Sequence, residues 1–400
     1  VPSLTIYHNQ VARGYRIFTM NKALSELLLL IEPKMTVYVG GSCAEPHGLL
    51  DLIASDNSLH SIHFIQQPLG AVNQRDLSLI SRDSTQRTFF MTPQLQEGLS
   101  AGRVLFVPMH MRAIYDYLLN TRIDVALLQA ARDKDGKLRF GPNVDYVDAV
   151  LASARHLVIE ENSAFIAPMG APLVDESSVD LIVLVEGKKP LYPLSEPDDV
   201  SNTIGKLIAS LIRDGDCLQT GIGAVPAAIV ANLQGHNDLG FHGGLMDDGI
   251  MKLITNGNLT GVKKAIDHNQ HVLGMALGSE ALLDWLGQDD KAKGVVFRSA
   301  NYTHDVGVIS CLDNFVSVNS AIEIDLMGQV NAEVASGKQI SGTGGSVDFM
   351  RAAKASKGGR SIVAMTSTAK RGEISRIVPM VSVVTALRTD VDIVVTEYGI

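Results

Sequence analysis

Short apolar runs recur along the chain, and segments with helical spacing or glycine turns separate them. In the first half these runs are Thr36–Val39, Ile62–Ile65, Val104–Val107, Val125–Leu128, Leu157–Ile159 and Leu181–Val185. Apolar runs this short that alternate with helical segments predict buried strands joined by crossover helices. The sequence therefore predicts an α/β fold, with mainly parallel sheets flanked by helices.

The length predicts more than one domain, because 400 residues exceed the size of a typical single core. The segment Gly187–Pro197 is rich in proline, glycine and lysine, as linkers often are. It also follows the last strand-like run of the first half. We therefore predict an N-terminal domain over residues 1–187 and a C-terminal domain over residues 198–400.

Local patterns add smaller predictions. A helix is expected over Asn21–Ile31, with Asn21 as its N-cap. A strand is expected over His271–Leu277, followed by a helix that Ser279 caps. The charged stretch Arg132–Lys137 contains an Asp-Gly turn and is expected on the surface.

Composition excludes several classes of protein. The net charge is −9 and there is no basic tract, which argues against a nucleic-acid partner. No apolar run approaches the ~20 residues of a membrane-spanning helix, and the first ten residues do not have the pattern of a signal peptide. The chain has only three cysteines, which favours reduced thiols and a cytoplasmic location.

The stretch Asp216–Gly249 carries the clearest local chemistry. An apolar run at Cys217-Leu218 leads into a glycine turn over residues 219–226 and then a helical segment over 227–233. A glycine turn before a helix lets backbone N–H groups approach an anion, although an ordinary strand-to-helix turn fits equally well. Further on, Asp247 and Asp248 open a second helical segment, where carboxylates suit the helix dipole.

Other side chains allow both a chemical and a structural interpretation. Glu323 and Asp325 are two residues apart and share one face of a strand, as an acid/base pair or as an exposed polar face. Cys43 is either a nucleophile or, more simply, a small residue in a crowded turn. The run Ser341–Ser346 is rich in glycine and precedes a helix expected over Val347–Ala355.

Six segments, taken in chain order, resemble the motifs of a known protein family. The segments LQTGIGAVPAAI, LGFHGGLMDDGI, VNSAIEIDLMGQVNAE, SGTGGSVDFMRAA, SRIVP and DVDIVVTEYGI resemble the acetyl-CoA hydrolase/transferase family, especially its 4-hydroxybutyrate CoA-transferase branch. The resemblance runs from about Val39 to Ile400, and it stops inside a motif past which the family continues, so we expect a longer natural chain. It implies two related α/β domains with the active site in the cleft between them.

The resemblance also implies a reaction and its participants. Family members move coenzyme A from a short-chain acyl-CoA, such as acetyl-, butyryl- or 4-hydroxybutyryl-CoA, to a free carboxylate. Coenzyme A is then a substrate and product, no metal is required, and the protein is expected to be a cytoplasmic homodimer in acetate metabolism.

Individual positions take on roles through the same resemblance. The CoA-binding positions that it implies are Gly221, Ile222, Gly223, Ala224, Val225, Asn319, Gly342, Gly344, Gly345 and Lys370. Among them, Asn319 is expected to face the catalytic carboxylate and the thioester. The glycines of the Ser341–Ser346 turn are expected to form an oxyanion hole, and Lys370 to contact CoA. A simple turn and a surface lysine are the structural alternatives.

One position departs from the family. Relatives carry His-Thr-Glu or His-Ser-Glu where this chain has His242-Gly243-Gly244, so Gly244 replaces the glutamate that attacks the thioester. Three possibilities remain open. Asp247 or Glu323 substitutes as the catalytic carboxylate of a transferase; a carboxylate activates water in an acyl-CoA hydrolase; or the chain binds acyl-CoA without turnover.

Overall fold

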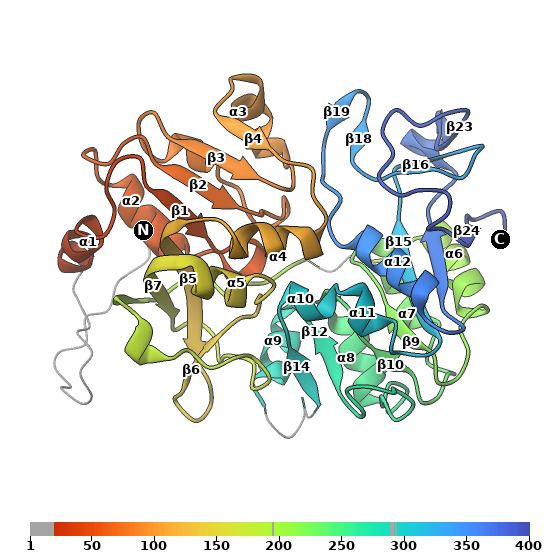
Figure 1. Cartoon of the computed structure of the whole chain (residues 1–400). Helices are drawn as coiled ribbons and strands as arrows, with labels where there is room; N and C mark the ends of the chain where they lie inside the picture. The colour runs from red at the N-terminus through yellow and green to blue at the C-terminus, as the bar shows by residue number, and fades with distance from the viewer. Residues whose placement is uncertain (1–19, 194–195, 289–291, 293) are drawn as a thin grey trace. The chain divides into compact units, whose positions relative to one another are not determined.

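The computed structural model describes all residues except 1–19, 194–195, 289–291 and 293. The first ten residues, tested above for a signal peptide, therefore lie outside it. The described residues form two compact units (Figure 1). Unit 1 comprises residues up to 107, 115–192 and 283–292; unit 2 comprises residues 108–114, 193–282 and 293–400.

Unit 1 is built on one large sheet with the strand order β4-β3-β2-β1-β5-β7-β8. All of these neighbours are parallel, and only β6 pairs antiparallel, with β5. The strands are β1 (Thr36–Val39), β2 (His63–Gln66), β3 (Thr85–Thr88), β4 (Val104–Phe106), β5 (Ile123–Arg132), β6 (Leu138–Phe140), β7 (Ala154–Asn162) and β8 (Leu181–Val185). The helices are α1 (Met20–Leu28), α2 (His47–Ala54), α3 (Gln96–Ser100) and α5 (Val147–Ser153); α4 (Met111–Leu119) and α9 (Glu280–Leu286) contain residues of both units.

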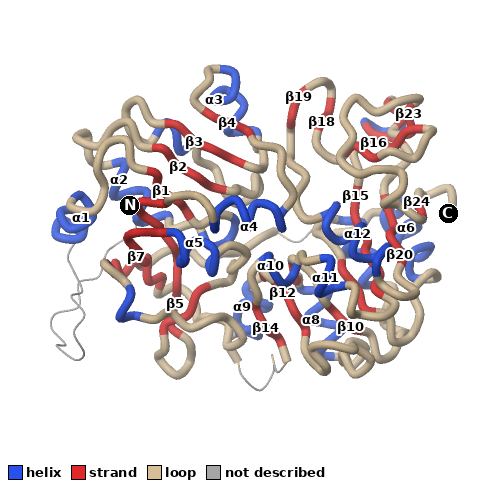
Figure 2. The backbone as a smooth tube through the Cα atoms, in the orientation of Figure 1, coloured by secondary structure: helices blue, strands red, loops and turns tan. Residues whose placement is uncertain are grey.

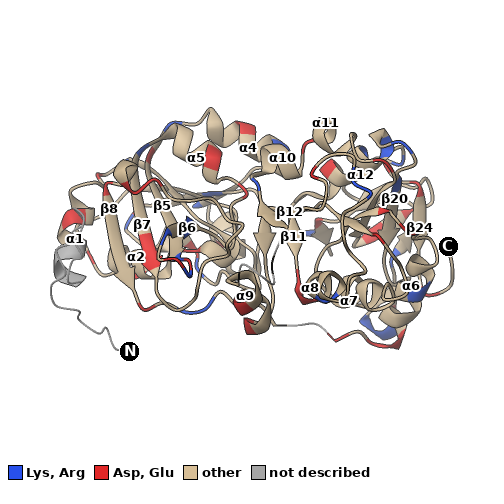
Figure 3. Cartoon of the chain, turned by 90° about the horizontal axis from the view of Figure 1, so that it is seen from below, with Lys and Arg blue, Asp and Glu red and all other residues tan. Residues whose placement is uncertain are grey.

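The main core of unit 1 lies between the sheet and the helices α1 and α2. Leu27 of α1 and Leu49 and Ile53 of α2 pack with Val37, Val125 and other strand residues in one buried cluster. The helix α5 lies on the other side of the sheet from α2, as Figures 1 and 3 both show. Helices on both faces bury both sides of the central strands β1 and β5, which explains why these two read as continuous apolar runs, whereas β3 has the polar sequence TQRT.

Unit 2 contains a smaller parallel sheet with the order β10-β9-β15-β20-β24. Its strands are β9 (Cys217–Gln219), β10 (Gly240–Phe241), β15 (Phe315–Ser320), β20 (Arg360–Ala364) and β24 (Ile393–Val395). Shorter strands are β11 (Leu245–Met246), β12 (His271–Leu273), β13 (Met275–Ala276), β14 (Val295–Phe297), β16 (Glu323–Asp325), β17 (Val330–Asn331), β18 (Val334–Ala335), β19 (Lys338–Gln339), β21 (Thr368–Ala369), β22 (Ile374–Ser375) and β23 (Ile377–Val378). The helices are α6 (Asp199–Ala209), α7 (Ala224–Ala231), α8 (Asp248–Thr255), α10 (Ala300–Thr303), α11 (Val306–Ile309) and α12 (Ser346–Ala355).

The helix α12 forms much of the core of unit 2. Phe349 and Ala352 of α12 pack with Phe315 of β15 and Ile309 of α11 in one cluster, and Met350 packs with Val363 of β20 in another. The backbone tube in Figure 2 shows the strands of this sheet among the helices. This packing fixes the start of α12, where the Ser341–Ser346 turn lies, against the ends of the strands.

The α/β prediction is confirmed, and several local predictions need correction. The first helix begins at Met20, so Asn21 lies inside it and is not its N-cap. The expected strand His271–Leu277 is two short strands, because Gly274 interrupts the extended conformation between β12 and β13. In the charged stretch, Asp133 is buried rather than exposed, because it accepts a 2.6 Å hydrogen bond from Arg139 Nε and further bonds from backbone N–H groups.

Charge is distributed over both units. Lysine and arginine alternate with aspartate and glutamate along the described chain (Figure 3). Within the described residues, no helix has the length and apolar character needed to cross a membrane.

Candidate active site

The candidate site of unit 2 lies where the strand order of the sheet reverses. The chain runs outward from β9 to β10, and then in the other direction through β15, β20 and β24. The carboxyl ends of β9 and β15 therefore flank a topological switch point, which is where parallel α/β sheets commonly bind ligands. The glycine turn that follows β9 and Asn319, near the carboxyl end of β15, both lie at this edge.

The glycine turn after β9 leaves space on its outer side. A Cβ at Gly221 or at Gly223 would meet no atom within 4 Å. Gly223 has φ +117°, a conformation that favours glycine, and it precedes the first residue of α7, Ala224. The turn thus presents the backbone at the start of α7 without a covering side chain, as the CoA-binding prediction for Gly221–Val225 requires.

Gln219 and Asn319 join the ends of β9 and β15. Asn319 Nδ2 donates to Gln219 Oε1 at 3.2 Å, and Gln219 Nε2 donates to Asn319 Oδ1 at 3.4 Å. Gln219 also approaches the second motif, since a Cβ at Gly243 would lie 3.4 Å from Gln219 Cγ. The amide pair therefore links Asn319 through Gln219 to the segment that contains Gly243.

His304 occupies the space beside Gly244. A Cβ built on Gly244 would lie 2.9 Å from both Cε1 and Nε2 of His304, which is closer than real Cβ contacts. The same ring lies against the second glycine turn, because a Cβ at Gly345 would be 2.4 Å from His304 Nε2. The imidazole thus lies against two glycine positions that leave no room for a Cβ, and its centroid is 4.5 Å from that of the Phe349 ring, which is tilted by 43°.

Thr303 and burial bear on the protonation of His304. Thr303 Oγ1 lies 3.3 Å from Ser299 O and 2.8 Å from His304 Nδ1. The general base proposed below requires the tautomer in which the hydroxyl donates to Ser299 O, Nδ1 carries the ring N–H and Nε2 carries a lone pair. Burial lowers the pKa of His304 to about 4, although nearby Asp348 opposes this shift. The ring is therefore neutral at pH 7, and its Nε2 faces the two glycines.

The second glycine turn supplies backbone donors next to this nitrogen. Gly344 has φ +57°, where a glycine is strongly favoured, and its carbonyl accepts from Met111 N at 3.0 Å. Among the described residues, the N–H groups of Gly344 and Gly345 donate no backbone hydrogen bond. Backbone N–H groups beside a lone pair are the kind of arrangement that stabilises an oxyanion while a base takes a proton.

Two residues from a distant part of the sequence, His110 and Arg112, attach to carboxylates near this turn. His110 forms an ion pair with Asp348 of α12, and Arg112 N donates to the same carboxylate at 3.2 Å. Arg112 Nε in turn donates to Asp305 at 2.9 Å. The segment 108–114 is thereby attached to the start of α12 and to the residue that follows His304.

The carboxylates proposed as substitute nucleophiles have structural partners. Asp247 caps α8 by accepting from Ile250 N at 3.1 Å, and burial raises its pKa. Glu323 accepts from Asn331 Nδ2 at 3.1 Å. Asp325 is buried rather than exposed, and it accepts backbone N–H bonds from Met327 and Gln329 that organise the following turn.

Of the remaining predicted residues, Gly342 lies in the second glycine turn, whereas Lys370 and Cys43 lie elsewhere. Gly342 is buried in the same turn as Gly344, whereas Lys370 is exposed in a short 3-10 helix, η5 (Lys370–Gly372). Cys43 is buried in unit 1, where burial raises the pKa of its thiol, so it is not an activated nucleophile. Among the described residues, no group of three or more histidine, cysteine, aspartate or glutamate side chains could hold a metal ion.

Unit 2 thus combines a parallel sheet that has a topological switch point with two glycine turns and a buried, neutral histidine, which defines an α/β protein. The chain belongs to the acetyl-CoA hydrolase/transferase family. It matches the N-terminal domain of that family over residues 15–183 and its C-terminal domain over residues 278–400.

Known relatives support the assignment over most of the chain. The 4-hydroxybutyrate coenzyme A transferase of Clostridium kluyveri is 34% identical over 397 residues, covering 96% of this chain and 90% of that protein. The butyryl-CoA:acetate CoA-transferase of Anaerostipes caccae is 35% identical over 322 residues, covering 76% and 70%. The crystal structure of RipA from Yersinia pestis has a TM-score of 0.86 at 29% identity, covering 96% of this chain and 89% of that one.

Sequence reasoning missed the residues that complete the site. His304 lies between two short helices, and nothing in its immediate sequence indicates a buried ring beside Gly244. Asp348 and His110 are separated by more than half of the chain, so only the fold brings them together. Gln219 lies inside the family-like segment LQTGIGAVPAAI, but its partner Asn319 becomes apparent only when β9 and β15 are paired in the sheet.

Proposed function

We propose that this chain hydrolyses a short-chain acyl-CoA, with His304 as the general base and the turn at Gly344-Gly345 as the oxyanion hole. One observation carries the proposal. The imidazole of His304 fills the space beside residue 244, where transferases of this family carry the attacking glutamate. Water activated by a base is the simplest replacement for a nucleophile that has no side chain.

Transfer to a second carboxylate is the rival function, and the local contacts favour it less. It requires a carboxylate that can attack the thioester and hold coenzyme A covalently. Asp247 is committed to the N-terminus of α8, and Glu323 to Asn331. The atoms nearest to a Cβ at Gly244 belong to His304 and Phe349, and to neither of these carboxylates.

The chemical steps follow from the protonation of His304. A water oxygen attacks the thioester carbonyl carbon while its proton passes to His304 Nε2. The carbonyl oxygen gains negative charge and accepts hydrogen bonds from the N–H groups of Gly344 and Gly345. The C–S bond then breaks, and the proton on Nε2 passes to the sulfur of coenzyme A. Removing one such backbone donor or base typically costs about 100-fold in rate or more.

An assay with competing acceptors tests the proposal. The protein is incubated with acetyl-CoA, with and without butyrate, and free coenzyme A and new thioesters are measured. Hydrolysis predicts coenzyme A release at a rate independent of butyrate, with no adduct trapped by borohydride or hydroxylamine. Butyryl-CoA and a trapped carboxylate would instead establish a transferase with a substitute nucleophile. Tight binding of coenzyme A without release would establish a binding protein.

The acyl group proposed is acetyl, butyryl or 4-hydroxybutyryl, as the names of the transferase relatives suggest. A homodimer, a cytoplasmic location and a role in acetate metabolism stay predictions. Coenzyme A binding by Gly221–Val225 and Lys370 is part of the proposal, and the open outer side of the glycine turn supports it.

A further inference from the structure

Glu333 is a buried carboxylate of unit 2 that the reaction proposed above does not use. It lies between β17 and β18, at the end of the family-like segment VNSAIEIDLMGQVNAE, and it precedes the second glycine turn by eight residues in the chain. Burying a carboxylate is costly unless hydrogen-bond donors surround it. The donors that Glu333 gathers therefore show which segments it holds in place.

Among the described residues, three neutral side chains donate to this carboxylate. Gln339 Nε2 donates to Glu333 Oε1 at 3.3 Å, and Thr343 Oγ1 donates to the same oxygen at 3.5 Å. Thr385 Oγ1 donates to Oε2 at 2.8 Å. Glu333 thus joins a residue of β19, a residue of the glycine turn and a residue of the loop that precedes β24.

The backbone of Glu333 holds the entry to the same turn. Ile340 N donates to Glu333 O at 2.8 Å, and Ser341 N donates to it at 3.3 Å. The carbonyl therefore fixes residues 340 and 341, while the carboxylate fixes the side chain of Thr343. Thr343 directly precedes Gly344, so both attachments lie immediately before the backbone N–H groups of Gly344 and the residue after it.

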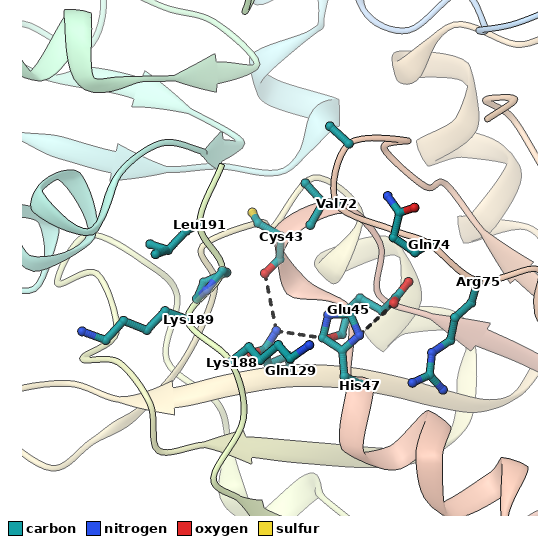
Figure 4. Close-up of a pocket in the computed structure, with 12 residues that line it drawn as sticks. Cys43, Glu45, His47, Val72, Gln74, Arg75, Gln129, Lys188, Lys189 and Leu191 are labelled. Atoms are coloured by element: carbon teal, nitrogen blue, oxygen red, sulfur yellow. Dashed lines mark hydrogen bonds and ion pairs between the residues drawn. The ribbon is translucent and has the colours of Figure 1, made fainter. Parts of the chain in front are cut away.

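Unit 1 contains a buried glutamate that organises a glycine turn in the same way. Glu45 lies in the turn over residues 40–46, which follows β1, and it accepts from Gln66 Nε2 at 2.7 Å and from Asn73 Nδ2 at 2.8 Å. Asn73 in turn accepts from Ser42 N at 2.9 Å and donates to Ser42 O at 3.1 Å. Figure 4 shows Glu45 paired with His47 at the end of this turn. In both units, a buried carboxylate and its neutral donors define the path of a glycine turn.

We propose that Glu333 is a positioning residue: by holding Thr343, it orients the N–H groups of Gly344 and Gly345 for the thioester oxygen. The Gly344 N–H belongs to the planar peptide that begins at the Thr343 carbonyl carbon, so the conformation of Thr343 sets its direction. Backbone donors stabilise an oxyanion only when they are aimed at the position that it occupies. The inference rests on the proposed function, because it assigns Glu333 to the oxyanion hole of that reaction.

Two conservative variants test the proposal through the kcat and KM for acetyl-CoA. Glu333→Gln keeps the shape of the side chain but replaces one acceptor by a donor, and Thr343→Val removes one hydroxyl. Each should lower kcat by roughly tenfold, because a misaligned donor loses part of its effect, with KM and coenzyme A affinity unchanged. Thr203→Val is the matched control. It removes a hydroxyl bond to Asp199 O in α6 and should change neither constant.

The double variant shows whether Glu333 and Thr343 act together. Its kcat should be no lower than that of Glu333→Gln, because Thr343 has already lost its acceptor in that single variant. Effects on kcat that multiply would show independent roles and overturn the proposal. A rise in KM without a fall in kcat would also overturn it, since that result indicates a role in substrate binding alone.

Hydrogen-exchange mass spectrometry separates this inference from the proposed function. Peptides that cover residues 341–346 should exchange faster in Glu333→Gln and in Thr343→Val, while peptides from α6 should not change. Circular dichroism melting verifies that each variant is folded. If the unmodified chain releases no coenzyme A from acetyl-CoA, the proposed function fails, and faster exchange in this turn would still support Glu333 as its anchor. Unchanged exchange in the turn, or faster exchange with unchanged kcat in an active protein, would overturn the inference.

Discussion

The imidazole of His304 lies so close to Gly244 that a Cβ at residue 244 would be 2.9 Å from both Cε1 and Nε2 of the ring. The ring also excludes a Cβ at Gly345. The His304 ring therefore occupies the volume that a side chain at position 244, such as the family glutamate, would need. Replacing residue 244 alone cannot restore the transferase site, because the ring stands in the way.

A double-mutant cycle measures this coupling. Gly244→Glu alone is expected to lower the free energy of unfolding by about 1–3 kcal/mol, because the added side chain overpacks against His304. Adding His304→Ala removes the ring and should recover much of that loss, a coupling of about 1–3 kcal/mol. Only the double variant should form a glutamyl thioester with acetyl-CoA, detected by mass spectrometry.

Gly243→Ala is the matched control, since its Cβ would meet Phe241 at 3.3 Å and Gln219 at 3.4 Å. Equal stability of the single and double glutamate variants would contradict the assigned contact.

The proposed base predicts an unusual pH profile. Burial lowers the pKa of His304 to about 4, so its Nε2 is available throughout the neutral range. We expect the kcat/KM for acetyl-CoA hydrolysis to vary by less than about twofold between pH 5 and 8 and to fall only toward pH 4. His304→Gln should lower kcat by about 100-fold while coenzyme A still binds. A rate that falls through pH 6.5 would indicate a different, solvent-exposed histidine.

The two units should respond to pH in opposite directions. In unit 2, burial lowers the pKa of His242 to about 3 and those of His271 and His304 to about 4. The unfolded chain binds more protons than unit 2 between about pH 4 and 6.5, so acidification destabilises unit 2 over this window, on the order of 1–3 kcal/mol per histidine. In unit 1, burial raises the pKa of Asp145 and Glu160 to about 7, so unit 1 binds more protons than the unfolded chain below pH 7 and loses stability as pH rises toward 7.

Hydrogen-exchange mass spectrometry at pH 5 and pH 7.5, corrected for intrinsic exchange rates, distinguishes the units. Peptides from β9 and β15 should lose protection at pH 5, whereas peptides from β5 and β7 should lose protection at pH 7.5. A parallel change in both sets would contradict the assignment of these buried groups.

Asp348 should anchor the segment 108–114. It pairs with His110 and accepts from Arg112 N at 3.2 Å while buried. Asp348→Asn keeps the shape but removes the charge, so we expect a loss of about 1.5–3 kcal/mol in unfolding free energy and faster hydrogen exchange in 108–114. Asp116→Asn, at an exposed position of α4, is the control. Unchanged exchange in 108–114 would show that the backbone bond from Met111 to Gly344 is sufficient.

Asp247→Asn tests the rival nucleophile. Asparagine caps helices about as well as aspartate, so the variant should retain stability within about 0.5 kcal/mol. If Asp247 is only the cap of α8, turnover of acetyl-CoA is expected to persist in this variant. Loss of turnover without loss of stability or coenzyme A binding would restore Asp247 as a chemical participant.

The sequence was sufficient for strands that are buried on both faces. Such strands appear as uninterrupted apolar runs, as Val125–Leu128 does inside β5, whereas the polar strand β3 was not predicted. Glycine turns are also local, so the turns at Gly223 and Gly344 could be recognised from nearby residues. Their positive φ angles give the physical reason for glycine there.

Long-range packing could not be predicted in the same way. Asp133 and Asp325 lie among residues that suggest exposure, yet both are buried. A hydrogen bond from Arg139 stabilises Asp133 there, and backbone N–H groups stabilise Asp325. The contact between His304 and Gly244 joins residues sixty positions apart, with no periodic pattern between them. The departure at Gly244 was visible in the sequence, but the side chain that fills its space was not.

Labelled water provides the most direct test of the central claim that water, rather than a carboxylate of the chain, accepts the acyl group. The protein is incubated with acetyl-CoA and butyrate in water enriched in oxygen-18, and the products are analysed by mass spectrometry. The account predicts acetate that carries one solvent oxygen, a stoichiometric release of coenzyme A and no butyryl-CoA. Formation of butyryl-CoA with unlabelled acetate would contradict it.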